Sequence, residues 1–363
     1  MSSLAALRPT NEAEERKRFL AALRTGSSYE PQLKYASALK AAKVRASCDQ
    51  YFSKRFADQA VQILDGVVRD YGDQTKYEAA CWGDVLEASD IEAACSEYAQ
   101  SNKIQGLVHF EWNPSTLVTS CVGSKVNLVP TPGYYRSLRL ASLLDHEVGT
   151  HFLRLHNHKL TFPNSKAGNP AWKHDQGWLL ATEEGLATIN TNQSYTDKRL
   201  WVPALHYHAC ILASNLPFSK LWHRLAPYLG HDEDRLWITC LRVKRGLEDT
   251  GLPGGYYKDQ SNFDGALRLL ERRSEINFQL LHCVRVSIED FPRALSHAQR
   301  ALSTGNAILP AFVSNETRLS SYRVALDEIA AANGVCGPNA VAVTAPDPER
   351  ERNEAAALPE VEL

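Results

Sequence analysis

The chain has 363 residues, of which 44% are hydrophobic and 23% are charged, as in an ordinary globular protein. Its formal net charge is only -2, so no overall electric field draws it to nucleic acid or to an anionic membrane. Eight scattered cysteines include no CxxC pair, which argues against a disulfide scaffold and a thiolate metal site. The N-terminus lacks the apolar core of a signal peptide, and no apolar run is long enough to cross a membrane. We therefore expect a cytoplasmic protein with reduced cysteines and with no nucleic-acid or membrane partner.

The hydrophobic pattern divides the chain into three parts. Residues 1–30 are largely polar and charged, and we expect an N-terminal extension with a frayed helix there. Residues 31–340 carry the regular apolar periodicity of one main domain, which begins with a helical layer. Residues 341–363 have few large apolar side chains and predict a disordered C-terminal tail.

A small sheet is predicted in the middle of the chain. Residues 107–112, a β-branched run ending at Val122, and residues 125–129 read as three short strands separated by turn residues. The third strand is a candidate edge strand, onto which an extended peptide would add.

Helices are predicted to follow the sheet. One begins near Ser137, a loop covers residues 157–177, and a second helix runs from Trp178 toward Asn192. Further helical segments are expected at about 203–245, 264–286 and 318–332. The predicted fold class is α+β: a mostly helical single domain with a small sheet preceding the helix that carries the motif described next.

The segment HEVGTH, residues 146–151, contains two histidines five positions apart. In a regular α-helix this spacing turns the side chains roughly 140° from each other, whereas the common HExxH spacing leaves roughly 40°. Gly149 lies in the spacer and lowers the cost of a π-bulge, which absorbs one extra residue and returns His146 and His151 to one face. The alternative is that both are ordinary histidines on a buried helix.

The segment TEEGLA, residues 182–187, favours the metal-site interpretation. It resembles the glutamate segment that completes the site in thermolysin-like and aminopeptidase zinc enzymes, and catalytic zinc usually has three protein ligands. Glu184 is the predicted third ligand of one zinc ion per chain, with Glu183 as the alternative. Glu147 is then the predicted general base, which takes a proton from the attacking water and returns one to the leaving amine.

Other polar residues near the motif have two readings. Asp145, Thr150 and Asn190 either form hydrogen bonds to a metal-binding imidazole or carboxylate, or belong to a solvated helix face. His156 and His158, in the predicted loop after the motif, are not expected to bind the metal. In the segment 206–208, HYH, a histidine or the tyrosine either donates a hydrogen bond to the oxyanion of the tetrahedral intermediate or packs within a helix.

Five blocks together resemble the microtubule-associated tyrosine carboxypeptidase family, which includes uncharacterised bacterial relatives. The blocks are residues 110–114 (FEWNP), 143–154 (LLDHEVGTHFLR), 182–187 (TEEGLA), 242–246 (RVKRG) and 254–259 (GGYYKD). The resemblance implies that residues 31–340 are a zinc metallopeptidase catalytic domain. His146, His151 and Glu184 correspond to the ligands and Glu147 to the base, and the implied reaction removes a C-terminal tyrosine from α-tubulin.

A carboxypeptidase must also bind the terminal carboxylate of its substrate. Arginine or lysine suits this task, and the candidates are Arg242, Lys244, Arg245 and Lys258, each of which has a solvated surface cation as its alternative reading. Tyr256 and Tyr257 either contact substrate or pack under their loop. A basic groove would assist the encounter with the glutamate-rich tubulin tail.

Two further hypotheses remain open. After the GGYYKD block the family pattern has a tyrosine where this chain has Asn262, so one alternative is a zinc peptidase of the same family with a different peptide substrate. The other is a non-catalytic protein that binds microtubules. The retained ligands and base favour an enzyme, which we expect in the cytoplasm, associated with microtubules.

Overall fold

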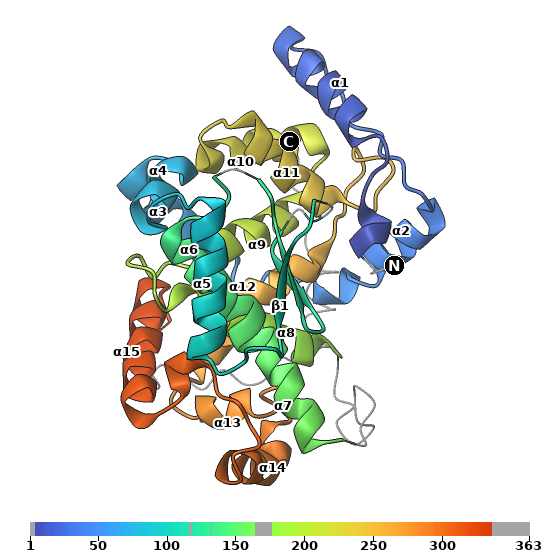
Figure 1. Cartoon of the computed structure of the whole chain (residues 1–363). Helices are drawn as coiled ribbons and strands as arrows, with labels where there is room; N and C mark the ends of the chain where they lie inside the picture. Colours follow the sequence, from blue (N-terminus) through green and yellow to red (C-terminus); the bar gives the residue numbers. More distant parts are fainter. Residues whose placement is uncertain (1–3, 115, 117, 132, 164–175, 336–363) are drawn as a thin grey trace.

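The computed structural model describes residues 4–114, 116, 118–131, 133–163 and 176–335, and the predicted tail at 341–363 lies outside this part of the chain. The predicted mostly helical α+β architecture is confirmed, with one three-stranded sheet in the described residues (Figure 1). None of the helices described is both long and apolar enough to cross a membrane. The helices before the sheet are α1 (Glu12–Thr25), α2 (Ala38–Ala46), α3 (Ala57–Tyr71), α4 (Gln74–Cys81) and α5 (Ala88–Ser101). Those after it are α6 (Ser137–Leu144), the π-helix η3 (Asp145–Phe152), α7 (Leu153–Thr161), α8 (Gln176–Asn192), α9 (Trp201–Ala213), α10 (Phe218–Leu229), α11 (Glu233–Lys244), α12 (Gln260–Glu271), α13 (Phe278–His282), α14 (Phe291–Ser303) and α15 (Glu316–Ala332).

The sheet has the predicted strands in an order that corrects one prediction. Strands β1 (His109–Trp112) and β2 (Ser120–Val122) both pair with β3 (Lys125–Leu128), the first in parallel and the second antiparallel. β3 is therefore the central strand, and the prediction that it forms an edge is wrong. β2 is the edge strand that packs against η3.

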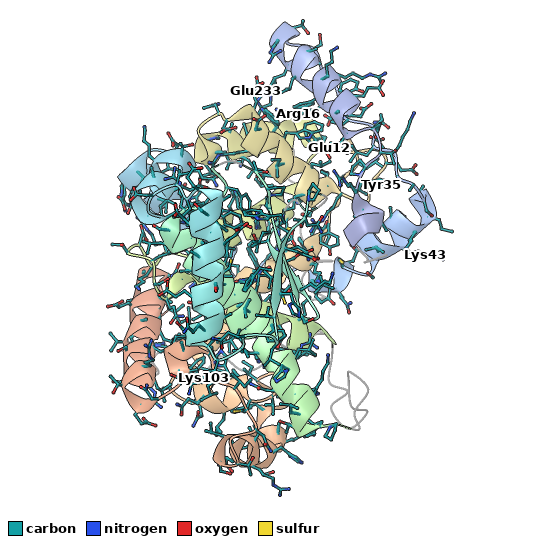
Figure 2. The ribbon with its side chains drawn as sticks, viewed as in Figure 1. Glu12, Arg16, Tyr35, Lys43, Lys103 and Glu233 are labelled. Carbon is teal, nitrogen blue, oxygen red and sulfur yellow. The ribbon has the colours of Figure 1, made fainter. Side chains whose placement is uncertain are left out.

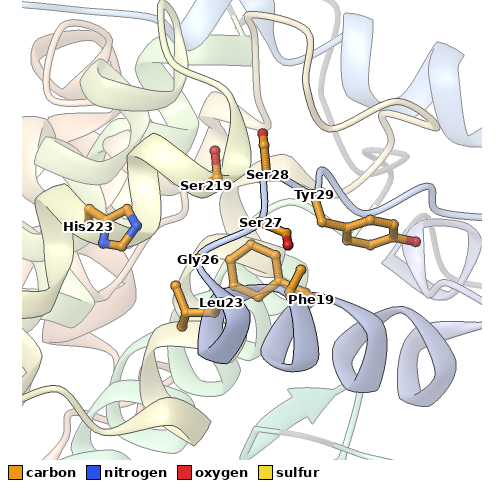
Figure 3. A pocket seen from close by; sticks show the side chains of 9 residues that line it. Phe19, Leu23, Gly26, Ser27, Ser28, Tyr29, Ser219 and His223 are labelled. Atoms are coloured by element: carbon orange, nitrogen blue, oxygen red, sulfur yellow. The ribbon is translucent and has the colours of Figure 1, made fainter.

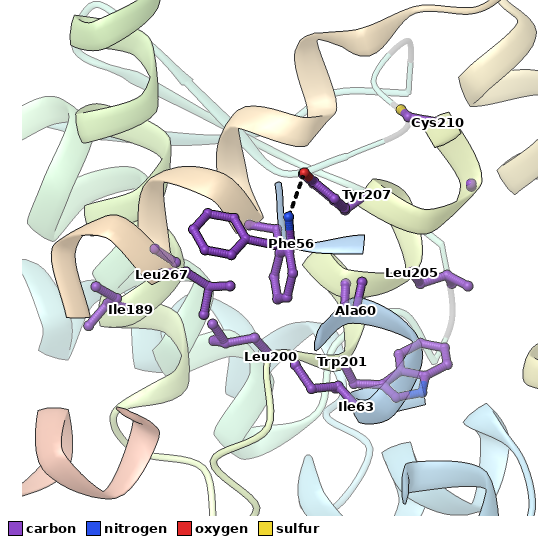
Figure 4. Packing of buried hydrophobic residues seen from close by; sticks show 14 of the residues in the cluster. Phe56, Ala60, Ile63, Ile189, Leu200, Trp201, Leu205, Tyr207, Cys210 and Leu267 are labelled. Carbon is purple, nitrogen blue, oxygen red and sulfur yellow. Dashed lines mark hydrogen bonds between the residues drawn. The ribbon is translucent and has the colours of Figure 1, made fainter. Parts of the chain in front are cut away.

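Two hydrophobic cores meet where the histidine motif lies. The smaller one, which we call the sheet core, joins α5, the sheet, α6 and the buried Val148 of η3. The larger one, the main core, joins α3 with most of the helices from α8 onward and includes Leu186 and Ile189 of α8. Figure 4 shows a part of the main core, where the hydroxyl of Tyr207 accepts a hydrogen bond from the backbone N–H of Phe56 at 3.2 Å. The cores hold η3 and α8 against each other.

The N-terminal segment is anchored to the main core although α1 projects from the body in Figure 1. Phe19 is 2% exposed and its ring lies 5.0 Å from the rings of both Phe218 and Trp222. Figure 2 labels Glu12 and Arg16 on α1 and Glu233 on α11; Arg16 pairs with Asp234, and Arg24 pairs with Glu233 at 3.2 Å. The domain boundary at residue 30 stays a prediction.

A cavity of about 240 Å³ lies between the end of α1 and α10 (Figure 3). Phe19 and Leu23 line it together with Ser219 and His223. None of its lining residues belongs to η3, α8 or α12, so it is separate from the site described next.

Candidate metal centre

The π-helix η3 brings the two predicted histidine ligands together. A π-helix closes each turn one residue later than an α-helix, so residues five apart lie on one face. The ring centroids of His146 and His151 are 5.0 Å apart. A Cβ on Gly149 would lie 2.7 Å from the Tyr98 hydroxyl and 3.1 Å from the Phe312 ring. Glycine is therefore required here by close packing as well as by the irregular helix.

A glycine contact between α8 and α12 sets the position of Glu184. A Cβ on Gly185 would lie 2.2 Å from the backbone of Gly265, and one on Gly265 would lie 1.8 Å from the carbonyl oxygen of Ala181. Only two glycines allow the helix backbones to approach this closely. The glycine after Glu184 thus has a structural reason that the sequence pattern alone does not reveal.

His146, His151 and Glu184 form a three-residue group whose ligand atoms all lie within 4.8 Å of one another. Among the residues that the structure describes, this is the only group of His, Cys, Asp or Glu with such spacing. His151 Nε2 lies 3.7 Å from Glu184 Oε2. Two imidazole nitrogens and one carboxylate oxygen match the ligand set of catalytic zinc sites. The donor set therefore fits zinc.

Each histidine is held through the ring nitrogen that faces away from this group. The hydroxyl of Thr191 donates to the carbonyl of Ala187 at 2.8 Å, so its oxygen is left to accept from His146 Nδ1 at 3.0 Å. His151 Nδ1 lies 3.4 Å from a carboxylate oxygen of Glu183. Such partners fix the tautomer in which Nε2 carries the lone pair for a metal. Burial also lowers the pKa of His146 to about 3, which keeps its ring neutral.

Glu183, the alternative ligand, lies behind His151 and outside the three-residue group. Its side chain is 3% exposed and forms ion pairs with Arg154 and with Arg285, the latter at 3.3 Å. The two guanidinium groups outweigh the effect of burial and hold the pKa of Glu183 well below its usual range. The fully buried Arg154 also donates to the backbone carbonyls of Leu281, Val284 and Val286. Glu183 thus positions His151, and the ligand hypothesis is best carried by Glu184.

Glu147 lies beside the three-residue group and is held by the sheet. One of its carboxylate oxygens accepts a hydrogen bond from the backbone N–H of Cys121 at 2.8 Å, and the other lies 3.9 Å from His146 Nε2. Burial raises the pKa of Glu147 to about 7. The contact with β2 has no signal in the sequence, because it depends on how the edge strand lies against η3.

The three residues expected to support the ligands act one layer further out. Asp145 accepts from the Tyr98 hydroxyl at 2.9 Å, and Asn190 donates to Thr150 at 2.8 Å. These bonds tie η3 to α5 and α8. The sequence analysis considered Asn190 as a residue that supports a metal ligand. In the structure the hydrogen-bond partner of His146 is instead the next residue, Thr191, which was not predicted.

Two of the predicted substrate cations, Arg242 and Arg245, bind one aspartate just before α12. Asp259 accepts from Arg242 at 2.7 Å and from Arg245 at 3.0 Å, and these charges outweigh burial and lower its pKa. Arg242 remains 30% exposed. Tyr257 is 7% exposed and packs on Phe52 with ring centroids 4.8 Å apart. We call Arg242, Arg245, Lys258 and Asp259 the cation cluster.

Lys244 is not available to a substrate. Its side chain is fully buried and donates to the backbone carbonyls of Leu252 at 2.7 Å and Ala213 at 3.3 Å. Burial lowers its pKa to about 8. Lys244 therefore fastens the loop that leads to Tyr256 and Tyr257, and the prediction that it could bind substrate is wrong.

The other histidines of the described residues lie outside the three-residue group. His156 and His158 belong to α7, which continues to Thr161 where a loop was predicted. In the HYH segment, Tyr207 is buried in the main core, and His208 packs edge-on against Tyr228. His206 lies near the cation cluster, and burial followed by the charge of Arg242 lowers its pKa to about 3.

Comparison with known proteins extends the motif resemblance to almost the whole chain, although no family model matches it. It is 33% identical over 341 residues to microtubule-associated tyrosine carboxypeptidase 1 of Homo sapiens, an alignment that covers 91% of this chain and 68% of that protein. The protein of the same name in Rattus norvegicus is 32% identical over 336 residues, with the same coverage. Putative tyrosine carboxypeptidase MATCAP2 of Mus musculus is 30% identical over 334 residues, covering 90% of this chain and 61% of that protein. With this likeness added to the motif blocks, the chain belongs to the microtubule-associated tyrosine carboxypeptidase family.

Proposed function

We propose that the protein is a zinc-dependent carboxypeptidase that removes a C-terminal tyrosine from the acidic tail of α-tubulin. The observation that carries the proposal is the convergence of His146, His151 and Glu184 beside the buried Glu147. Family membership supports the reaction class, since the relatives are named tyrosine carboxypeptidases. Their names also support an association of this protein with microtubules.

The metal would be held by Nε2 of each histidine and by the carboxylate of Glu184. Both Nδ1 atoms already have partners, in Thr191 and Glu183, so the opposite nitrogens are the available donors. When bound, zinc lowers the pKa of a coordinated water to about 7 and polarises the scissile carbonyl.

Glu147 supplies the proton transfers. Its carboxylate takes a proton from the attacking water and passes it to the amine of the departing residue. The N–H of Cys121 holds one carboxylate oxygen at 2.8 Å, which leaves the other directed toward the histidine pair. The base is therefore fixed before substrate arrives, and little rearrangement is needed during the reaction.

The substrate main chain is placed along β2 in this proposal. β2 is an edge strand, and the N–H of its central residue Cys121 already faces the base. Extended peptides commonly bind by adding a strand to such an edge. This location replaces β3, whose two sides are occupied by β1 and β2.

The cation cluster is the proposed site for the acidic tail and its terminal carboxylate. Asp259 offsets one of the two arginine charges, and Lys258 adds a cation that forms no ion pair within the described residues, so the cluster keeps a positive balance. Asp259 of the cluster directly precedes α12, whose first turn carries Asn262, 3.2 Å from Glu184. A positive cluster joined to the metal centre through the start of α12 suits a substrate that ends in carboxylates.

Mass spectrometry of a synthetic peptide ending in Glu-Glu-Tyr tests the proposal. We expect the intact protein to release one tyrosine, and the Glu147→Gln variant and chelator-treated protein to release none. Zinc binding without cleavage would favour a different peptide substrate, to be sought with a peptide library. If Glu147→Gln retained every measurable property of the intact protein, the non-catalytic hypothesis would replace the enzyme.

A further inference from the structure

Glu184 is held differently from its neighbour Glu183. His151 is backed by the carboxylate of Glu183, and Glu183 is in turn paired with two arginines. Glu184 is the next residue, yet its carboxylate receives a hydrogen bond from an uncharged amide, Nδ2 of Asn262, at 3.2 Å. Two consecutive glutamates thus have partners of different charge.

The position of Asn262 follows from the glycine contact described above. Because Gly185 and Gly265 bring α8 and α12 into backbone contact, the first turn of α12 lies against one face of α8. Asn262 Nδ2 spans two residues one turn apart on that face, Glu184 and Thr188, the latter at 3.5 Å from its hydroxyl oxygen. The amide is therefore fixed by two acceptors on one helix.

We propose that Asn262 is a positioning residue that holds the Glu184 carboxylate for the metal without neutralising its charge. The inference rests on the proposed zinc site. An arginine or lysine in this place would form an ion pair and compete with the metal for the carboxylate, as Arg154 and Arg285 occupy Glu183. An amide donor fixes the rotamer and leaves the negative charge available.

Removing the amide should weaken metal binding while the fold persists. Without Asn262 Nδ2, the Glu184 carboxylate, whose side chain is 23% exposed, is free to turn toward water. Loss of a hydrogen-bonding partner of a metal ligand typically lowers metal affinity about 10-fold to 100-fold.

The test compares Asn262→Leu, which keeps the volume, and Asn262→Ala with the intact protein. The matched control is Asp264→Ala, because Asp264 is a partly exposed polar residue of the same helix that pairs with Arg268. Zinc affinity is measured by competition with a chromophoric chelator. The melting temperature of the metal-free protein and the visible absorption bands of the Co²⁺-substituted protein are recorded for each variant.

We expect both Asn262 variants to lose about 10-fold to 100-fold in zinc affinity, with altered Co²⁺ bands and a metal-free melting temperature close to that of Asp264→Ala. Unchanged affinity and bands in both variants would overturn the proposal. A lowered melting temperature with unchanged zinc affinity of the folded fraction would also overturn it, because Asn262 would then act only in packing. Absence of zinc binding by the intact protein would instead remove the proposed function itself, so the two failures are distinguishable.

Discussion

The metal centre and the cation cluster both consist of residues from the family motifs, but their side chains are used in opposite ways. At the metal centre the protein partners bind the far side of each ring, and the Nε2 atoms of His146 and His151 are left facing Glu184. In the cation cluster the guanidinium groups of Arg242 and Arg245 bind Asp259 directly. The metal centre thus leaves two imidazole nitrogens converging on a carboxylate that keeps its charge, whereas the cation cluster neutralises part of its charge within itself.

The Glu147→Gln variant is the strongest test of the contrast between the metal centre and the cation cluster. The change removes the proton acceptor while the amide keeps an oxygen for the N–H of Cys121. We expect kcat for peptide cleavage to fall about 10²-fold to 10⁴-fold, the range for loss of a general base, with zinc affinity nearly unchanged. Steady-state kinetics and zinc titration measure this. Glu111→Gln, an exposed glutamate of β1 paired with Lys125, is the matched control. Full activity in Glu147→Gln would contradict the assignment of the base.

Gly265→Ala should damage the metal centre through the backbone. The added methyl group would lie 1.8 Å from the carbonyl oxygen of Ala181, so α8 and α12 must separate. We expect a loss of about 1–3 kcal/mol in the free energy of unfolding, together with weaker zinc binding. Chemical denaturation and zinc titration report the two effects. Gly66→Ala is the control, because its nearest neighbour is the flexible side chain of Arg199 at 3.2 Å. Equal stability of the two variants would show that the helix contact tolerates a side chain.

Lys258→Gln and Arg242→Gln separate the two uses of charge within the cation cluster. Lys258 forms no ion pair in the described part of the chain, so its loss should raise KM for an acidic peptide several-fold and leave stability nearly unchanged. Arg242 pairs with a buried aspartate, so its loss should also lower the free energy of unfolding, by about 3 kcal/mol. Peptide kinetics at two salt concentrations and denaturation curves measure both. Unchanged KM in both variants would remove the cluster from the substrate site.

Lys244 gives the smallest effect, a pH dependence of stability. Burial lowers its pKa from the ordinary 10.5 to about 8, so between these values the unfolded chain binds a proton that the folded protein lacks. Stability relative to Lys244→Met should therefore rise as the pH increases from about 8 to 10, by on the order of 1 kcal/mol. Denaturation of both proteins across this range measures the difference. A constant difference would show that Lys244 keeps its proton in the folded state.

The local parts of this structure were predictable from sequence. The five-residue histidine spacing with Gly149 predicts a helix that absorbs an extra residue, and the structure has a π-helix at Asp145–Phe152. The three strands and the helix of the TEEGLA segment were also found. α14 was missed, although the apolar side of this helix includes Phe291, Ala294, Ala298 and Ala301.

The nonlocal parts were not predictable. Strand order depends on pairing between distant segments, so nothing in β3 itself shows that it is central. The partner behind a histidine depends on the register between two helices, where one residue separates Asn190 from Thr191. The burial of Lys244 and the pairing of Asp259 depend likewise on contacts across the chain.

The π-helix also fixes how α7 is rotated about the helix axis relative to α6. Deleting Gly149 would give the four-residue histidine spacing that a regular α-helix can present on one face. The same deletion would turn the downstream helix by about 100° around its axis relative to the upstream one. Arg154 would then lose its ion pair with Glu183 and its hydrogen bonds to the carbonyls of Leu281, Val284 and Val286. The extra residue thus links the spacing of the histidines to the packing of α7. A four-residue spacing could replace the five-residue spacing in this fold only if α7 were repacked against its neighbours.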